Sequence, residues 1–312
     1  MDLELMDNVT ARVTAIIKTF ERPDKLLSLY ESLRTFYPTM KVIIVDDSAA
    51  PMTNAWDEHT EYVFTEYDIG LSAGRNLGVE KVQTPYCLLL DDDFIFTQKT
   101  KLENFVKILD DTEFQIVAGQ VLDFGKKCII FKGIMSVEND TLVLDSYKKG
   151  KKIGKLTCYD YVLNFFLAKT QVLRDHPWDP ELKIREHEEF FWRLKKNQIL
   201  ITATPSVAIS HFPTSDTVAH DDKYYEKRIE RLKFFHNLAC HKIGVTNFCP
   251  LGARYYGLGL FHYLLYLRHE SEKRCHQSYF WQLIFNIFKV KKRCSRLFKP
   301  EAAKSHRNEL SV

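Results

Sequence analysis

Three consecutive aspartates after an apolar run are the strongest chemical signal in the sequence. The run from Leu88 to Leu90 is followed directly by Asp91, Asp92 and Asp93. Carboxylates packed together after a buried strand repel one another and lose solvation, so they favour a bound cation. Hard oxygen ligands suit Mg²⁺ or Mn²⁺, and such an ion also neutralises a diphosphate leaving group. An exposed acidic loop or a helix cap is the alternative for these aspartates taken alone.

Two further polar segments could complete a nucleotide site. Asp46, Asp47 and Ser48 follow a second apolar run, and their carboxylates can accept hydrogen bonds from a base N–H or a ribose hydroxyl, although an ordinary turn is the alternative. Residues 68–78 place small residues and Arg75 at a turn into a helix, where a guanidinium and helical N–H groups suit phosphate. The GxGxxG pattern is absent, which disfavours nicotinamide chemistry.

The elements that must position these residues alternate through the first half of the chain. Apolar runs predict strands at 13–17, which is rich in β-branched residues, and at 41–45, 62–64 and 86–90. Helical patterns begin at Pro23, near Gly70 and at Leu102. This alternation predicts an α/β fold, with a mainly parallel sheet covered by helices on both faces. Ligands in such sheets bind beyond the carboxyl ends of the strands, where both acidic clusters fall.

The second half is less regular. Strands are expected at 116–122, 129–131, 161–168 and 199–210, a loop at 148–155 and a helix at 185–196. We therefore predict a catalytic domain over residues 1–222 and a basic helical region over 223–312.

The C-terminal region is predicted to contact a membrane surface. From Lys223 onward the chain has 18 lysines and arginines against 6 acidic residues, although the whole chain carries a net charge of only +3. Residues 255–268 and 279–298 add many aromatics to this basic region, a pattern typical of helices at an anionic interface. A solvated basic helix, a packed helical subdomain and a dimer contact are the alternatives.

Location is predicted from the cysteines and from the first residues. The seven cysteines form no CxxC pair, which favours a reducing compartment. Residues 1–11 lack the features of a signal peptide, and no apolar run reaches the length of a transmembrane span. We expect a cytoplasmic protein or a peripheral one on the inner membrane face, and a Golgi lumen location if an N-terminal anchor is missing from the sequence.

The clusters, in this order and spacing, resemble the GT-A glycosyltransferases of the large inverting class. The chain is most similar to the catalytic domain of ganglioside-type β-1,4-N-acetylgalactosaminyltransferases, over roughly residues 12–245. The segments that carry the resemblance are FYPT at 36–39, VDDS at 45–48, AGRNL at 73–77, LDDDFIFT at 90–97, VLNFFLA at 162–168 and HEEFF at 187–191. The resemblance implies a GT-A fold followed by the basic C-terminal region.

The resemblance also implies a donor site with Mn²⁺ or Mg²⁺ as cofactor. The aspartate triplet would be the DxD motif, with Asp93 as metal ligand, Asp91 near the ribose and metal-bound water, and Asp92 beside the donor. His211 would be a second metal ligand, although a lone histidine after a strand is more often structural. The residues implied in nucleotide binding are Thr19, Arg22, Asp46, Asp47, Arg75 and Asn76.

The catalytic base is expected in the acidic segment that begins at Glu186. In the resembling class this helix start carries the carboxylate that deprotonates the incoming hydroxyl. Here the aspartate most often used is replaced by His187. Glu189 is our preferred base, with Glu188, His187 and Glu186 as alternatives.

Together these features predict an enzyme that moves N-acetylgalactosamine, or a related hexose, from a UDP-sugar to a hydroxyl of a glycan or glycolipid with inversion. A galactosyl-, glucosyl- or N-acetylglucosaminyltransferase of the same fold is the nearest alternative. A non-catalytic sugar-nucleotide- or glycan-binding module is the alternative from another class. Nucleic acid is not an expected partner, because no recognisable nucleic-acid-binding module is present.

Overall fold

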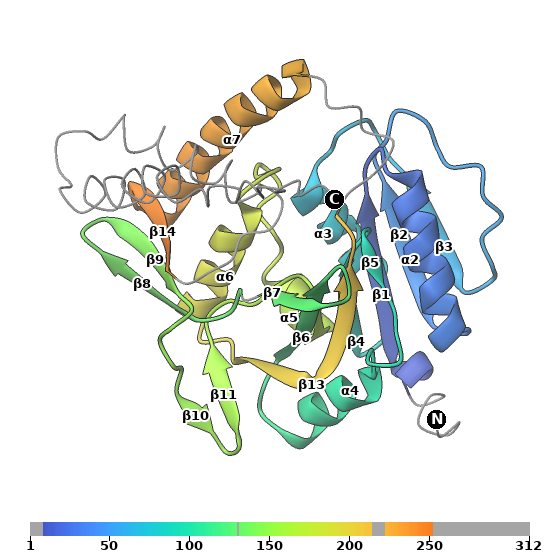
Figure 1. The fold of residues 1–312 in the computed structure, drawn as a ribbon, viewed down its shortest axis with the longest axis horizontal. Helices are drawn as coiled ribbons and strands as arrows, with labels where there is room; N and C mark the ends of the chain where they lie inside the picture. Colours follow the sequence, from blue (N-terminus) through green and yellow to red (C-terminus); the bar gives the residue numbers. More distant parts are fainter. Residues whose placement is uncertain (1–8, 130, 214–221, 252–312) are drawn as a thin grey trace, which may run out of the picture. The chain divides into compact units, whose positions relative to one another are not determined.

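The computed structural model describes residues 9–129, 131–213 and 222–251, which belong to one compact unit (Figure 1). The aromatic segments predicted at 255–268 and 279–298 lie outside these residues. Two ion pairs tie the helix that begins at Asp222 to this unit, Arg231 to Asp68 at 2.7 Å and Lys242 to Asp179 at 2.6 Å. The domain boundary expected at residue 222 stays a prediction. Within the described residues, no helix is both long and apolar enough to cross a membrane.

The elements follow the order expected of an α/β protein. The strands are β1 (Val13–Thr19), β2 (Lys41–Asp46), β3 (Thr60–Phe64), β4 (Tyr86–Asp91), β5 (Phe94–Ile95), β6 (Ile116–Asp123), β7 (Lys127–Ile129), β8 (Ile134–Glu138), β9 (Thr141–Asp145), β10 (Lys152–Ile153), β11 (Leu156–Tyr159), β12 (Phe166–Lys169), β13 (Ile201–His211) and β14 (Asn247–Leu251). The helices are α2 (Pro23–Phe36), α3 (Leu71–Lys81), α4 (Leu102–Asp111), α5 (Thr170–Asp175), α6 (Glu186–Lys196) and α7 (Asp222–Ile243).

The central sheet confirms the predicted fold class. Its strand order is β10-β11-β13-β6-β12-β4-β1-β2-β3, with β5 added to β13 and β7 to β6. Strands β4, β1, β2 and β3 run parallel, as do β6 and β13, whereas β12 runs antiparallel between β4 and β6. A separate sheet has the order β14-β9-β8.

Helices on both faces explain why the central strands are apolar throughout. Every residue of β1 is buried, as expected for a parallel strand that is covered on both sides. Ile16 faces one core with residues of α3, α5 and α6, and Ile17 faces the other with residues of α2 and α4 (Figure 1). Helix α2 begins with Pro23, whose fixed φ suits the first helical position. The sheet therefore holds the carboxyl ends of its strands rigidly in place.

The main differences from the expected elements lie after residue 130. The apolar segment 161–168 forms a strand only from Phe166, because the preceding residues pack in the core without a ladder. The short β10 lies inside the expected loop at 148–155. The hairpin β8–β9 and strand β14 were not predicted. Strand β14 pairs in parallel with β9, which lies about a hundred residues earlier, so its pairing is set by tertiary contact.

Candidate active site

Chemical groups from distant parts of the sequence meet at the carboxyl ends of the central strands. In the parallel pairing of β1 with β4, Lys18 lies opposite Asp91, so Thr19 and the aspartate triplet share one edge. The antiparallel pairing of β13 with β5 places His211 opposite Phe94, directly after the triplet. The edge predicted from the strand pattern thus gathers residues that are more than a hundred positions apart.

Arg22 binds two aspartates of the triplet. Its guanidinium lies 2.6 Å from Asp93 Oδ2 and 3.2 Å from Asp92 Oδ1, and Thr19 donates a hydrogen bond to Asp92 Oδ2 at 2.9 Å. Burial raises the pKa of Asp92 to about 7 despite the nearby guanidinium. Burial also acts to raise the pKa of Asp93, but His211 and Arg22 outweigh it and lower that pKa to about 2. The pKa values of these two adjacent carboxyl groups are therefore shifted in opposite directions.

His211 lies between two buried carboxylates. Its Nε2 is 3.5 Å from Asp93 Oδ2, and its Nδ1 is 3.3 Å from Asp123 Oδ1 at the end of β6. Burial alone would lower the pKa of His211, but the two aspartates raise it above its usual value. The other oxygen of Asp93, Oδ1, is buried and has no hydrogen-bond partner among the described residues.

A second cationic side chain, Arg75, connects the triplet to helix α6. The Arg75 side chain is buried, and its guanidinium lies 3.2 Å from Asp91 Oδ1 and 2.8 Å from Glu186 Oε1. Asn164, just before β12, donates its amide N–H to both oxygens of Asp91 at 3.3 and 3.2 Å. Asp91 is thereby oriented by two donors from different elements, and Glu186 becomes its neighbour through a shared guanidinium.

The second acidic cluster is satisfied within the protein. One oxygen of Asp46 accepts from the backbone N–H and the hydroxyl of Ser48, and the other accepts from Tyr62 at 2.6 Å. Asp47 accepts from Lys18 and, at 2.9 Å, from the backbone N–H of Gly70. Gly70 has a φ of +94°, a conformation that L side chains rarely adopt. Asp47 therefore holds the loop that leads into α3, while Asp46 holds the turn after β2 against β3.

An aromatic pair lies beside this cluster. Phe20 follows Thr19 directly, and its ring centroid is 5.5 Å from that of Tyr67, whose side chain is 63% exposed. The Lys18 ammonium lies 5.8 Å from the centre of the Phe20 ring. An exposed ring at a buried polar edge offers a flat apolar surface to a ligand.

The first turn of α6 contains acidic side chains that point to different partners. Both oxygens of Glu189 accept from Arg193, at 2.8 and 3.1 Å, and Glu188 pairs with Arg185 at 2.7 Å. His187 contacts the Val162 carbonyl at 2.6 Å, and burial lowers its pKa. Glu186 contacts Arg75, which in turn contacts Asp91, so this side chain is connected to the triplet.

The donor set at Asp93 and His211 fits a divalent cation. Within the described ranges, no group of three or more His, Cys, Asp or Glu side chains is arranged to hold a metal. Mg²⁺ and ions like it commonly use one or two protein ligands, and take the rest from water and substrate phosphates. The Oδ1 of Asp93, which has no hydrogen-bond partner among the described residues, and the adjacent imidazole of His211 supply such a pair of ligands.

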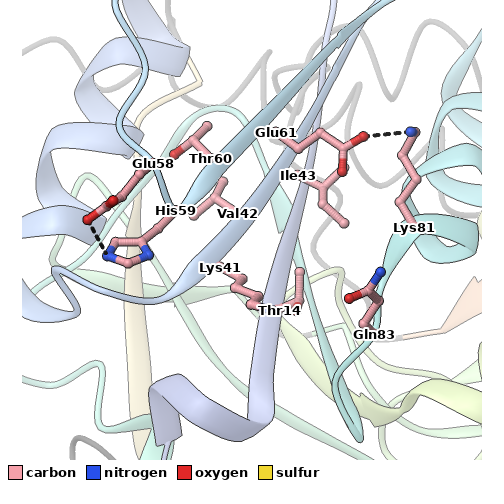
Figure 2. A pocket seen from close by; sticks show the side chains of 10 residues that line it. All are labelled: Thr14, Lys41, Val42, Ile43, Glu58, His59, Thr60, Glu61, Lys81 and Gln83. Atoms are coloured by element: carbon pink, nitrogen blue, oxygen red, sulfur yellow. Dashed lines mark hydrogen bonds and ion pairs between the residues drawn. The ribbon is translucent and has the colours of Figure 1, made fainter.

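A pocket at the opposite edge of the sheet has a different character. A pocket of about 220 Å³ lies at the amino ends of β1, β2 and β3. The residues that line it include Lys41, His59, Glu61, Lys81 and Gln83 (Figure 2). Lys81 pairs with Glu61 at 2.6 Å, and His59 lies 3.8 Å from Glu58. None of the residues predicted to act on a ligand lines this pocket.

Comparison with known proteins identifies the family. The model of glycosyl transferase family 2 matches residues 14–176, which is more than half of the chain and includes the aspartate triplet. The chain belongs to glycosyl transferase family 2. This membership confirms the prediction of a glycosyltransferase, and the observed sheet confirms its fold.

Individual relatives agree with this family assignment. The chain is 39% identical over 192 residues to mouse β-1,4 N-acetylgalactosaminyltransferase 1, a match that covers 59% of this chain and 36% of that protein. It is 35% identical over 222 residues to mouse β-1,4 N-acetylgalactosaminyltransferase 2, covering 69% and 43%. The chain thus spans less than half the length of these curated relatives.

A solved structure shows the same fold at low sequence identity. The crystal structure of GalNAc-T7 with UDP, GalNAc and Mn²⁺ matches with a TM-score of 0.50 and 13% identity, covering 76% of this chain and 52% of that one. At this identity the match bears on the fold alone.

The family 2 chain brings together most, but not all, of the predicted site residues. Besides Asp91, Asp92 and Asp93 themselves, the residues that contact a carboxylate of the triplet directly are Thr19, Arg22, Arg75 and His211. Asn76 instead exchanges hydrogen bonds with the backbone of Trp178, at 2.7 and 2.9 Å. Among the described residues, Asp46, Asp47 and Glu189 bond to partners other than the triplet. The roles predicted for them, and for Glu188 and His187, stay predictions.

Asp123 and Asn164 are site residues that our sequence reasoning did not assign. Asp123 ends strand β6, so the rule that selected the aspartate triplet, a carboxylate after a buried strand, also applies to it. Asn164 lies inside a segment of the family resemblance, but nothing local predicts that it faces Asp91. Its position follows from the antiparallel pairing of β12 with β4.

Proposed function

We propose that this protein transfers N-acetylgalactosamine from UDP to a hydroxyl of a glycan or glycolipid, with inversion and with a divalent cation. The observation that carries the proposal is the buried Asp93 beside the mostly buried His211 and Arg22, with one Asp93 oxygen that is buried and has no hydrogen-bond partner among the described residues. The choice of sugar is supported by the names of the relatives, which are β-1,4 N-acetylgalactosaminyltransferases.

The nucleotide would lie along the edge formed by Thr19, Arg22 and Asp91. Phe20 and Tyr67 offer ring surface for the uracil, and Asp91 offers carboxylate oxygens to ribose hydroxyls. Arg22 and Arg75 are the cations that face the diphosphate. Because carboxylates already orient both guanidinium groups, these side chains lose little further conformational entropy when the donor binds.

Asp93 and His211 would hold Mn²⁺ or Mg²⁺ in this site. The ion supplies positive charge for the departing diphosphate. Arg22, which the structure places against Asp93, is the chain's own cation at this position and would turn toward the phosphates when the ion is bound.

The base would be a carboxylate of the first turn of α6. The sequence favours Glu189, whereas the contacts favour Glu186. Glu189 is held through both oxygens by Arg193, while Glu186 uses one oxygen for Arg75 and receives no hydrogen bond on the other from the described residues. A base needs a lone pair that is available to the acceptor hydroxyl, so we propose Glu186 and keep Glu189 as its rival.

A donor screen tests the function directly. The purified chain should gain thermal stability with UDP and Mn²⁺ together, because ligands that bind the native state raise its melting temperature. It should also hydrolyse UDP-N-acetylgalactosamine slowly without an acceptor, and faster than UDP-galactose, UDP-glucose and UDP-N-acetylglucosamine.

Each alternative has a distinct outcome in that screen. If the chain preferred another UDP-hexose, the proposed donor would be wrong but the proposed mechanism would be unaffected. A stability gain with UDP but no hydrolysis of any donor would favour a non-catalytic binding module. A peripheral membrane position and a lipid-linked acceptor are part of the proposal, and binding of the full chain to anionic vesicles tests them separately.

A further inference from the structure

Asp123 lies behind His211, on the side away from the aspartate triplet. It ends strand β6, and the parallel pairing of β6 with β13 places it directly opposite His211. Its side chain is buried, and its Oδ1 is 3.3 Å from His211 Nδ1. Among the described residues, His211 is the one side chain that bonds this carboxylate.

The two carboxylates beside His211 differ in their other partners. Asp93 shares its charge with Arg22 at 2.6 Å and contacts the imidazole at 3.5 Å. Asp123 has the shorter contact, and no second cation pairs with it among the side chains that the structure describes, which do not include that of Lys127. An ionised carboxylate accepts hydrogen bonds and cannot donate them. Asp123 therefore selects the imidazole form that carries a proton on Nδ1.

Packing and backbone hydrogen bonds around the His211 imidazole also restrict its orientation. The ring of Phe94 lies edge-on against it with centroids 5.8 Å apart, and the backbone N–H of Phe212 donates to the Asp93 carbonyl at 2.9 Å. The backbone of Asp123 closes a turn through its carbonyl, which accepts from Lys126 N at 3.0 Å. Asp123 therefore has little freedom to move away from Nδ1.

We propose that Asp123 is a positioning residue for the cation site. By accepting the Nδ1 proton of His211, it directs the Nε2 lone pair toward the space beside Asp93. A hydrogen-bonded carboxylate behind a metal-binding histidine fixes the tautomer and raises the basicity of the ligand. The inference rests on the proposed function, because it assumes that a divalent cation binds at Asp93 and His211.

The test replaces Asp123 with its isosteric amide. Asp123→Asn can present either an acceptor or a donor to Nδ1, so tautomer selection is lost while the side-chain volume is kept. We expect the dissociation constant for Mn²⁺ in the presence of UDP, measured by titration calorimetry, to rise about 10- to 100-fold. Asp160→Asn is the matched control, because Asp160 is another carboxylate paired with one cation, Lys195, at 2.7 Å. That control should bind Mn²⁺ as the wild type does.

A second measurement needs no variant. Nitrogen NMR of the wild-type chain with Mg²⁺ and UDP should show His211 protonated at Nδ1 and unprotonated at Nε2. A proton on Nε2 in that complex, or unchanged Mn²⁺ affinity in Asp123→Asn, would overturn the inference while the proposed function stands. A wild-type chain that binds no divalent cation would overturn both. Equal losses in Asp123→Asn and Asp160→Asn would show a purely structural role and would also overturn it.

Discussion

The two ends of the parallel strands both carry charged side chains, but they hold them differently. At the carboxyl end most of the charges are buried and they are shared, since Arg22 contacts the buried Asp92 and Asp93, and the buried Arg75 connects Asp91 to Glu186. At the amino end the pairs are separate and exposed. The side chains of Lys81 and Glu61 are 34% and 51% exposed (Figure 2).

This difference distinguishes a functional site from an ordinary charged surface. An exposed ion pair costs little to keep and contributes about 0–1 kcal/mol, so its presence says nothing about function. Buried carboxylates cost far more, and the raised pKa of Asp92 shows that its neighbours do not fully offset the cost. A fold keeps such an arrangement where a ligand uses it.

The largest effect is expected at Asp93. Asp93→Ala removes one of two proposed metal ligands and should lower sugar transfer by about 10³-fold or more, since the metal supplies several kcal/mol of charge stabilisation. It should also abolish the thermal stabilisation by Mn²⁺ with UDP. Initial rates and melting curves with and without EDTA measure both effects.

Glu61→Ala is the matched control for that variant. It removes a carboxylate of an exposed pair at the amino end and should leave transfer unchanged. Normal turnover by Asp93→Ala in the presence of EDTA would contradict the metal mechanism. Equal losses in the two variants would erase the distinction between the ends.

The next effect distinguishes the two candidate bases. Glu186→Gln should lower transfer by about 10²- to 10⁴-fold, the range for loss of a general base, with a smaller change in UDP affinity. Glu189→Gln should cost less, because its carboxylate is already held by Arg193. Rates and UDP binding are measured for both variants. A larger loss of transfer in Glu189→Gln would return the role to the residue that the sequence favours.

The regular part of the fold could be predicted because its signals are local. Strands β1, β2 and β4 are apolar runs, the first two rich in β-branched residues, and parallel order then places their carboxyl ends at one edge. The aspartate triplet was found for the same reason. Its position after β4 depends on nothing outside its own segment.

The remaining contacts depend on pairing between distant segments. Asn164 reaches Asp91 because β12 inserts antiparallel between β4 and β6, and no local pattern specifies that order. Likewise, the sequence shows four polar side chains at the start of α6 but not which of them faces Arg75. A helix turn spreads its side chains over all directions, so the partner is fixed by packing alone.

A smaller effect is expected in the pH dependence of stability. The folded-state pKa of Asp92 is about 7, above its ordinary value of 3.8, so its contribution to stability is complete below pH 4 and is lost as the pH rises through 7. Asp92→Asn cannot lose a proton, so it should gain stability relative to the wild type between pH 5 and pH 8. Urea denaturation in EDTA at the two pH values measures the gain.

Asp110→Asn is the control for this titration. Arg12 lowers the pKa of Asp110 below its ordinary value of 3.8, and neither of its partners, Arg12 and Tyr86, titrates near neutral pH. The difference between Asp110→Asn and the wild type should therefore stay constant between pH 5 and pH 8. If Asp92→Asn also showed a constant difference, burial would not dominate the ionisation of Asp92.

The smallest effect is expected at the amino end. Lys81→Gln breaks the exposed pair with Glu61 and should change the free energy of unfolding by at most about 1 kcal/mol, with transfer rates and Mn²⁺ affinity unchanged. Denaturation curves and initial rates measure this. A large loss of transfer in Lys81→Gln would mean that the pocket lined by Lys41, Glu61 and Lys81 is coupled to the opposite edge of the sheet. Burial and sharing of charge would then no longer mark the functional end, and the exposed pocket would need a ligand of its own.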